Sequence, residues 1–316
     1  MNVQSLVHNF WELTITGFAQ GAIYALFALG YTLVYGVLRL INFAHSEVFM
    51  IGTFSAILTW EWLGAGANTA IPGLFKVIAM LAASLVVAAL ASAAIAVLVE
   101  RLAYRPLRRR NAPPLAFLIT AIGASVVISE AVGVWTNRQP KGTPSLIQQK
   151  TQFHLFDASV TNLQIGIVLL ALAMMVALDQ FINRSRLGLG VRAVAQDPDT
   201  AALMGVNKDR VIALIFVLGG LMAGIAAVMY VLKIGNTRYD AGFMLGIKAF
   251  AAAVLGGIGN LRGALLGGML LGIVENYGSA LFGTQWINAI AFIALVIILL
   301  FRPTGLLGES LGKARA

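Results

Sequence analysis

Apolar residues form long runs that alternate with short polar stretches along almost the whole chain. A helix needs about 20 apolar residues to cross the hydrocarbon core of a bilayer. Runs near that length lie at residues 13–37, 43–63, 73–99, 114–135, 163–183, 211–233, 262–282 and 285–301. The pattern predicts an all-α, polytopic helical bundle of about eight or nine membrane segments, with residues 1–316 forming a single transmembrane domain.

One further run, at 244–258, is shorter than the others. As a helix it spans only about 22 Å, which is less than a full crossing. Irregular backbone at membrane depth is tolerated only where protein or a water-filled cavity surrounds it. We therefore expect this segment to be re-entrant or broken.

All eight prolines lie outside the middle of the apolar runs. A proline inside a helix removes a backbone hydrogen bond and clashes with the preceding turn, so this placement favours uninterrupted helices. Pro106, for example, is expected beyond the end of the helix at 73–99. No Lys or Arg precedes Arg39. The first segment thus lacks the positive region of a cleavable signal peptide, and we expect it to be retained.

Pairs of glycines spaced by four residues recur inside the runs. Small residues at this spacing let the backbones of two membrane helices approach closely. The pattern predicts tight helix packing, and a glycine-lined substrate path is the alternative. The residues are Gly17 and Gly21, Gly220 and Gly224, Gly242 and Gly246, Gly259, Gly263 and Gly267, and Gly268 and Gly272.

Composition strengthens the membrane interpretation. Charged residues make up 11% of the 316 positions and hydrophobic residues 59%, with a mean hydropathy of +0.86. An average soluble domain carries about 25% charged residues, so a soluble fold is excluded. The pI of about 10.1 is then not a sign of nucleic-acid binding. The chain has no cysteine, which excludes disulfides, thiolate metal sites and a cysteine nucleophile.

The basic residues predict the orientation of the chain in the membrane. If all nine segments cross and the N-terminus is outside, the C-terminus is in the cytoplasm and 15 of the 22 Lys and Arg residues lie on the cytoplasmic side. This distribution follows the positive-inside rule. Topology alone explains the arginine cluster at 101–110. Under this orientation the polar loop at 136–162 is outside, where it could meet a partner, and the loop at 184–210 is inside.

The inner loop at 184–210 contains the pattern of a short helix. Asp197 is a suitable N-cap, Pro198 suits the first helical position and Asp199 favours the positive end of the helix dipole. Gly205 can end the helix. A mere connection between two spans does not need a capped helix of two turns. The segment is either an ordinary surface helix or a docking element for a cytoplasmic partner.

The sequence lacks the common motifs of catalysis. There is no P-loop sequence to cradle phosphates, no His-Glu-x-x-His and no Gly-x-Ser-x-Gly. The three histidines are scattered, which disfavours a zinc site or an intramembrane hydrolase. If the protein works against a gradient, another subunit must supply the energy.

Ionisable and polar residues inside the runs are the better candidates for function, because each is costly in lipid. We expect Lys248 to extend to the outer interface. His45 and Glu47 should lie close to the cytoplasmic end of their segment, where capping and hydrogen bonding between helices explain them equally well. Glu130 and Glu275 could line an aqueous path or tie helices together. The candidate translocation path comprises Asn42, His45, Glu47, Glu130, Lys248, Glu275 and Asn276. So few ionisable groups disfavour a proton-coupled secondary transporter.

Several stretches resemble the permease subunits of bacterial branched-chain amino acid ABC importers, most closely those of the LivH type. The matching segments occur in order over nearly the whole chain, from about residue 13 to 308. They are 41–48 (INFAHSEV), 100–107 (ERLAYRPL), 185–188 (SRLG), 205–214 (GVNKDRVIAL), 248–259 (KAFAAAVLGGIG) and 302–308 (RPTGLLG).

The resemblance implies a non-catalytic pore subunit of the bacterial inner membrane that works by alternating access. Its partners would be a LivM-like second permease subunit, two ATP-binding subunits that hold ATP and Mg, and a periplasmic substrate-binding protein. The loop at 184–210 would then carry the coupling helix that contacts an ATPase. The implied coupling residues are Arg192, Gln196, Asp197, Pro198, Asp199, Ala201, Ala202 and Gly205.

The loop departs from one common pattern, and the substrate stays open. Many ABC permeases carry Glu-Ala-Ala-x-x-x-Gly here, whereas the segment 201–205 (AALMG) has shorter spacing and no Glu. The resemblance implies leucine, isoleucine or valine as substrate. A pore lined by small and apolar residues would also pass urea or short amides, which is the alternative.

Overall fold

The computed structural model describes residues 9–66, 73–144, 146–147, 150–155 and 158–308. Their contacts divide into two compact units. The first unit takes residues up to 32, 149–177 and those from 248 onward; the second takes 33–148 and 178–247. Helices α2 (Phe10–Leu38), α7 (Asn162–Arg184) and α11 (Ala241–Gly256) each contribute to both units.

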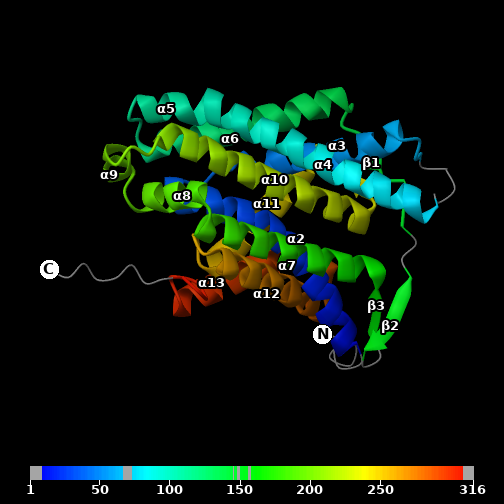
Figure 1. Ribbon diagram of the computed structural model, residues 1–316. Coiled ribbons are helices and arrows are strands. Elements are labelled where there is room, and N and C mark those ends of the chain that lie inside the picture. Colours follow the sequence, from blue (N-terminus) through cyan, green and yellow to red (C-terminus); the bar gives the residue numbers. More distant parts are fainter. Residues whose placement is uncertain (1–8, 67–72, 145, 148–149, 156–157, 309–316) are drawn as a thin grey trace. The chain divides into compact units, whose positions relative to one another are not determined.

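Each of the nine apolar runs forms a helix (Figure 1). Within the described residues, seven helical segments are long and apolar enough to cross a membrane. α11 is a shorter apolar helix of 16 residues, in line with the short run in the sequence. The prediction of a polytopic helical bundle is therefore confirmed. Besides α2, α7 and α11, the apolar helices are α3 (His45–Trp62), α4 (Leu74–Val99), α6 (Pro114–Trp135), α10 (Lys208–Ile234), α12 (Leu261–Phe282) and α13 (Ile287–Phe301).

The helix that begins with α4 does not end near residue 99 as expected. It continues through a π-helical turn, η1 (Glu100–Tyr104), into α5 (Arg105–Arg109), giving a segment of 36 residues. Pro106 therefore lies within helical structure. The wider π turn precedes the proline, and Pro106 occupies the first turn of α5, where a missing N–H costs little.

In the part of the chain that the structure describes, four short strands accompany the helices. In the first unit, β2 (Thr151–Leu155) pairs antiparallel with β3 (Ala158–Thr161), and Thr151 lies opposite Thr161. In the second, β1 (Lys141–Gly142) pairs antiparallel with β4 (Asn236–Thr237). Three further helices complete the described chain: α8 (Arg186–Gln196), α9 (Pro198–Leu203) and the 3-10 turn η2 (Thr284–Trp286).

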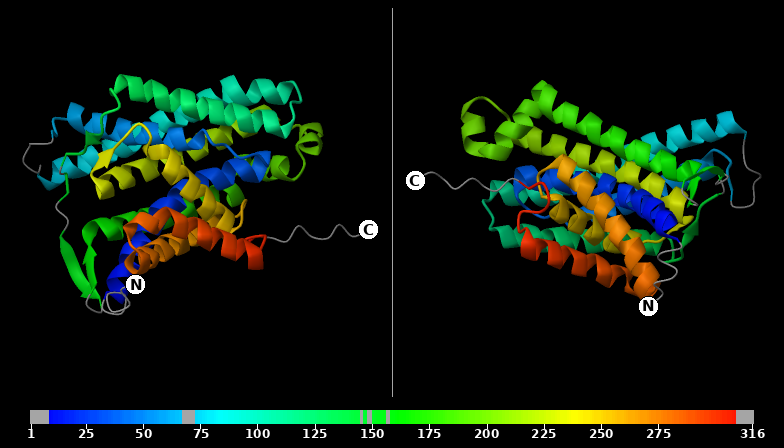
Figure 2. Two further views of the ribbon diagram at one scale, coloured as in Figure 1. Left: turned by 180° about the vertical axis from the view of Figure 1, so that it is seen from behind. Right: turned by 90° about the horizontal axis from the view of Figure 1, so that it is seen from below.

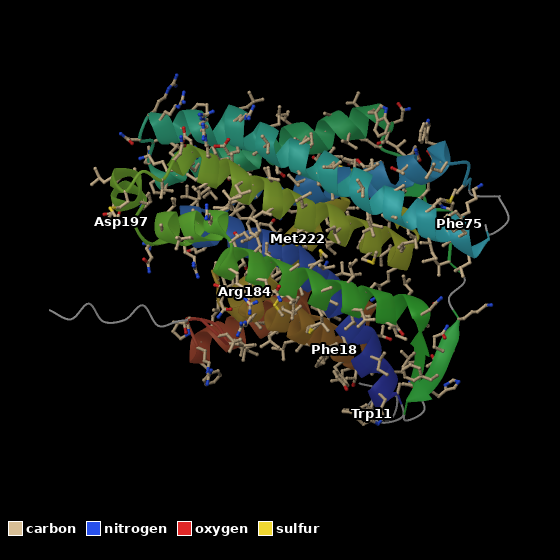
Figure 3. All side chains as sticks on the ribbon, in the orientation of Figure 1. Trp11, Phe18, Phe75, Arg184, Asp197 and Met222 are labelled. Carbon is tan, nitrogen blue, oxygen red and sulfur yellow. The ribbon has the colours of Figure 1, made fainter. Side chains whose placement is uncertain are left out.

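The core of the second unit is formed by α3, α4 and α10, which lie side by side (Figures 1 and 2). Glycines let these helices approach closely: a Cβ on Gly220 would lie 2.6 Å from the Cα of Ala93. The buried Met222 lies on the same helix, α10 (Figure 3). In the first unit, α12 packs against α13 and against the start of α2. There a Cβ on Gly21 would lie 2.5 Å from the carbonyl oxygen of Gly268, so the predicted tight glycine packing is confirmed.

Candidate functional site: a capped inner loop and two buried carboxylates

The loop between α7 and α10 is built from two capped helices of the second unit. The hydroxyl of Ser185 accepts the backbone N–H of Gly188 at 2.9 Å at the start of α8. One carboxylate oxygen of Asp197 accepts the backbone N–H groups of Asp199 (2.9 Å) and Thr200 (3.1 Å) at the start of α9. The hydroxyl of Thr200 donates to the other oxygen, and these bonds, led by that of the hydroxyl, lower the pKa of Asp197. The predicted N-cap is confirmed.

The end of α9 presents an apolar tip. Gly205 has a φ of +86°, the left-handed conformation that ends helices and favours glycine. Just before it, Leu203 is 88% exposed and Met204 is 81% exposed. Ala201 is buried, on the side of α9 that packs against α8 and α10. Two large apolar side chains held on a rigid, capped turn are typical of a contact surface. Figure 3 locates this turn by the label Asp197.

The other residues that the sequence predicted for coupling lie on or beside the same two helices and do not form one cluster. Gln196 and Ala202 are exposed, as are Pro198 and Asp199. Arg192 of α8 donates to the side chain of Asn183 at 3.3 Å. Lys208, at the start of α10, forms an ion pair with Asp199 at 3.3 Å. The loop is therefore braced at both ends, and its middle is exposed.

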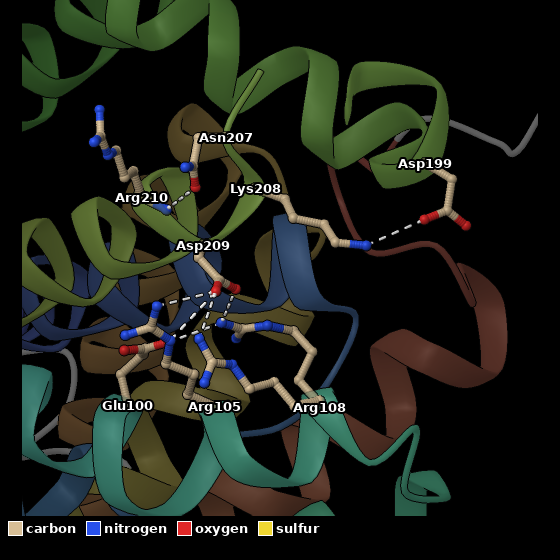
Figure 4. A network of polar contacts seen from close by, with 9 residues as sticks. Glu100, Arg105, Arg108, Asp199, Asn207, Lys208, Asp209 and Arg210 are labelled. Atoms are coloured by element: carbon tan, nitrogen blue, oxygen red, sulfur yellow. Dashed lines mark hydrogen bonds and ion pairs between the residues drawn. The ribbon is translucent and has the colours of Figure 1, made fainter. Parts of the chain in front are cut away.

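An ion-pair network fixes the base of this loop (Figure 4). Asp209, in the first turn of α10, pairs with Arg108 at 2.8 Å and with Arg105 at 3.1 Å. Arg108 also pairs with Glu100 of the π turn at 3.0 Å. Sequence reasoning assigned this arginine cluster to topology alone and so missed the network. The one signal was Asp209, an acidic residue at the start of an apolar run.

In the first unit, Lys248 does not extend to an interface as predicted. It is 7% exposed, and its ammonium pairs with Glu275 of α12 at 2.9 Å. The hydroxyl of Tyr24 donates to the other oxygen of Glu275 at 2.6 Å, and the Lys248 ammonium lies 5.8 Å from the centre of the Tyr24 ring. Lys248 can stay buried because the ion pair with Glu275 compensates both charges inside the protein, so its ammonium does not need to reach water.

In the second unit, Glu47 lies in the first turn of α3, near the end of its segment as predicted. It is 1% exposed and accepts the hydroxyl of Ser125, near the midpoint of α6, at 3.1 Å. The neighbouring backbone carbonyl of Val48 accepts the hydroxyl of Ser92, near the middle of the segment Leu74–Arg109. Glu47 therefore takes part in hydrogen bonding between α3 and α6, one of the two roles predicted for it. The other role is not seen, because the start of α3 has no side-chain cap.

The other predicted path residues do not gather at one place within either unit. Asn42 accepts the hydroxyl of Tyr104 at 3.0 Å, and His45 is buried at the start of α3. Glu130 forms an exposed ion pair with Arg138 at 2.6 Å. The side chain of Asn276 donates to the carbonyl of Gly272, one turn earlier in its own helix. No group of three or more metal-binding His, Asp or Glu side chains occurs among the described residues.

Comparison with known proteins places the whole chain in one family. Residues 13–300 match the family described as the branched-chain amino acid transport system permease component. The permease protein BraD of a high-affinity branched-chain amino acid transport system from Pseudomonas aeruginosa is 40% identical, over 96% of this chain and 97% of its own. The permease protein LivH of a high-affinity branched-chain amino acid transport system from Escherichia coli K12 is 41% identical, over 95% of this chain and 96% of its own. The probable branched-chain amino acid transport permease protein LivH of Methanocaldococcus jannaschii is 26% identical, over 92% of this chain and 90% of its own. No solved structure matches. The chain therefore belongs to the family of branched-chain amino acid transport permease components.

Proposed function

We propose that this chain is one permease subunit of an ATP-driven importer that carries leucine, isoleucine or valine across the bacterial inner membrane. The observation that supports this most is the match over nearly the full length to permease proteins of branched-chain amino acid systems. The seven apolar helical segments found in the described residues, each long enough to cross a membrane, agree with such a role. No catalytic role is proposed for the chain itself. ATP and Mg would be held by partner subunits.

The α8–α9 loop supports coupling to an ATPase. Movement in a partner can be transmitted only through a segment that is rigid and exposed. The Asp197 cap makes α9 rigid, while Leu203 and Met204 supply an exposed apolar contact. The base of the loop is fixed by Asp209, so a force on α9 would reach α10 and α5. This arrangement fits rigid-body alternating access driven by ATP hydrolysis.

The remaining partners follow from the same proposal. A second permease of the LivM type would complete the pore, and a periplasmic binding protein would deliver substrate. Lipid and the second permease would cover the apolar side chains that are exposed on α4, α6 and α13. The N-terminus would lie outside and the C-terminus in the cytoplasm, following the distribution of basic residues.

The test is reconstitution of this chain with the subunits encoded beside it. An ATPase subunit should co-purify with the chain, and proteoliposomes should import leucine only with ATP and the binding protein present. Import without ATP would overturn the importer assignment. Import of urea or a short amide in place of leucine would select the alternative substrate class.

The coupling helix has a test of its own. Replacing Asp197, Pro198 and Asp199 by Gly should leave the chain in the membrane and uncouple ATP hydrolysis from uptake. The variant Leu203→Ala/Met204→Ala keeps the cap and should weaken association with the ATPase. A matched control, Val126→Ala/Val127→Ala, removes exposed apolar surface from α6 and should recover the full amount of ATPase. Unchanged uptake in the Gly variant would show that α9 does not couple.

A further inference from the structure

Glu47 differs from the other buried acidic groups because its charge has no basic partner among the described residues. One of its oxygens, Oε1, accepts Ser125 at 3.1 Å and lies 3.2 Å from the hydroxyl of Ser46. A hydroxyl has a single hydrogen, and that of Ser46 is closer to the carbonyl of Phe43, at 2.6 Å. Ser125 is therefore the principal donor to this carboxylate.

The other oxygen of Glu47, Oε2, is fully buried and has no hydrogen-bond partner among the residues that the structure describes. Burying a carboxylate without a cation or a full set of donors is costly. A glutamine would fill the same space and accept the Ser125 hydroxyl without that cost. A carboxylate at this position is explained if a cation reaches Oε2 during the protein's working cycle.

The surroundings select the kind of cation. A metal ion such as Ca²⁺ takes six to eight oxygen ligands, far more than one carboxylate and two hydroxyls supply. A primary ammonium carries three donors in a compact group. Oε2 together with the free lone pairs of the Ser46 and Ser125 hydroxyls offers three acceptors. The number of acceptors fits an ammonium group.

An apolar cluster continues from this polar position along the same two helices. Met50 and Phe54 follow Glu47 at spacings of three and seven on α3, and Ile128 and Val132 follow Ser125 at the same spacings on α6. The buried core of this cluster is Met50, Phe54 and Val132, and Ile51, Ile128 and Tyr239 pack against it. The cluster begins about one helical turn, roughly 5 Å, from Glu47. An aliphatic side chain attached to the carbon that bears an ammonium would span that distance.

We propose that Glu47 and Ser125 form an intramembrane site that receives the ammonium group of the transported amino acid, with its aliphatic side chain along the Met50–Phe54–Val132 cluster. The inference rests on the proposed function and names the residues of this chain that recognise the substrate. High affinity is not required of such a site. The carboxylate of Glu47 compensates the positive charge of the ammonium group while the substrate passes.

The first experiment is ATP-dependent leucine uptake by the full reconstituted complex. Glu47→Gln keeps the shape and removes the charge, and we expect uptake to fall about 100-fold while assembly and ATP hydrolysis persist. Glu47→Asp should restore part of the uptake. The matched control Glu61→Gln, on the same helix α3 and in an exposed ion pair with Lys141, should stay within about twofold of the wild type. Uptake by Glu47→Gln at the wild-type rate would overturn the inference.

A second experiment uses the wild-type complex and does not depend on a variant. Dicyclohexylcarbodiimide modifies carboxyl groups in apolar surroundings, and mass spectrometry of the Glu47 peptide gives the rate. Leucine without its carboxylate, 3-methylbutylamine, should slow modification at least fivefold, whereas leucine without its amine, 4-methylpentanoate, should not. Equal effects of the two compounds would overturn the inference. So would a lack of modification, because a site that receives substrate must admit a small reagent.

The two experiments separate this inference from the proposed function. Failure of the wild-type complex to import leucine would refute the proposed function, and the protection pattern at Glu47 would still report on the site. Wild-type import together with unaffected Glu47→Gln would refute only the site. Slowing of the modification by Na⁺ as strongly as by 3-methylbutylamine would assign the site to an inorganic cation and overturn the proposal.

Discussion

Glu275 in the first unit and Glu47 in the second are both buried inside apolar helices, with exposed fractions of 3% and 1%. Their surroundings differ in one respect. Glu275 faces the ammonium of Lys248 and the hydroxyl of Tyr24, whereas Glu47 has only serine hydroxyls beside it among the described residues. The same side chain at similar burial thus has its charge balanced in one unit and left unbalanced in the other.

The difference separates a structural role from a transport role. Lys248, Glu275 and Tyr24 come from α11, α12 and α2, so the pair ties three helices of the first unit together. Its charges are satisfied within the chain and need nothing from a substrate. Glu47 is satisfied only in part, which is the condition expected of a group that meets a cation from outside.

The largest expected effect is on stability and comes from breaking the balanced pair. Lys248→Met leaves Glu275 buried without a cation, and we expect the free energy of unfolding in detergent micelles to fall by about 3–5 kcal/mol. The double variant Lys248→Met/Glu275→Gln removes both charges and should recover most of the loss. By contrast, Glu47→Gln strands no opposite charge and should unfold at the wild-type temperature or above.

This set of variants can also break the comparison. A loss of stability in Glu47→Gln as large as that in Lys248→Met would mean that the charge of Glu47 is balanced within this chain. Failure of the double variant to recover would mean that Lys248 and Glu275 do not act as a pair. Both outcomes are read from the same thermal unfolding series.

A smaller effect is expected from the hydroxyl donors. Tyr24→Phe removes a charged hydrogen bond of 2.6 Å from Glu275 and should cost about 1.5–3 kcal/mol of unfolding free energy. The control Tyr277→Phe removes a hydroxyl that contacts only uncharged groups, the Thr14 hydroxyl at 2.5 Å and the Phe10 carbonyl at 3.2 Å, and should cost about 0.5–1.5 kcal/mol. An equal cost for both variants would mean that water reaches Glu275 more readily than its burial indicates.

The sequence predicted the helices and the α9 cap because both depend on local chemistry. Apolar length defines a membrane helix, and the bonds from Asp199 and Thr200 to Asp197 form within four residues. The pairing of Lys248 with Glu275 could not be predicted, since it depends on how α11 packs against α12. The place of Glu47 near the start of its helix was predicted from the sequence. Its partner could not be, since Ser125 lies on α6, far away in the sequence.

The smallest expected effect comes from an acidic residue whose ion pair is exposed to solvent, in contrast to the two buried ones. Glu130 pairs with Arg138 at 2.6 Å, but both side chains are about half exposed, and the pair raises the pKa of Arg138. Exposed ion pairs contribute about 0–1 kcal/mol because water and salt screen them. Glu130→Gln should therefore change the unfolding temperature little, and less still at high salt. A loss comparable to that of Lys248→Met would show that this pair is covered in the assembled complex, because only removal from water makes one unpaired charge so costly.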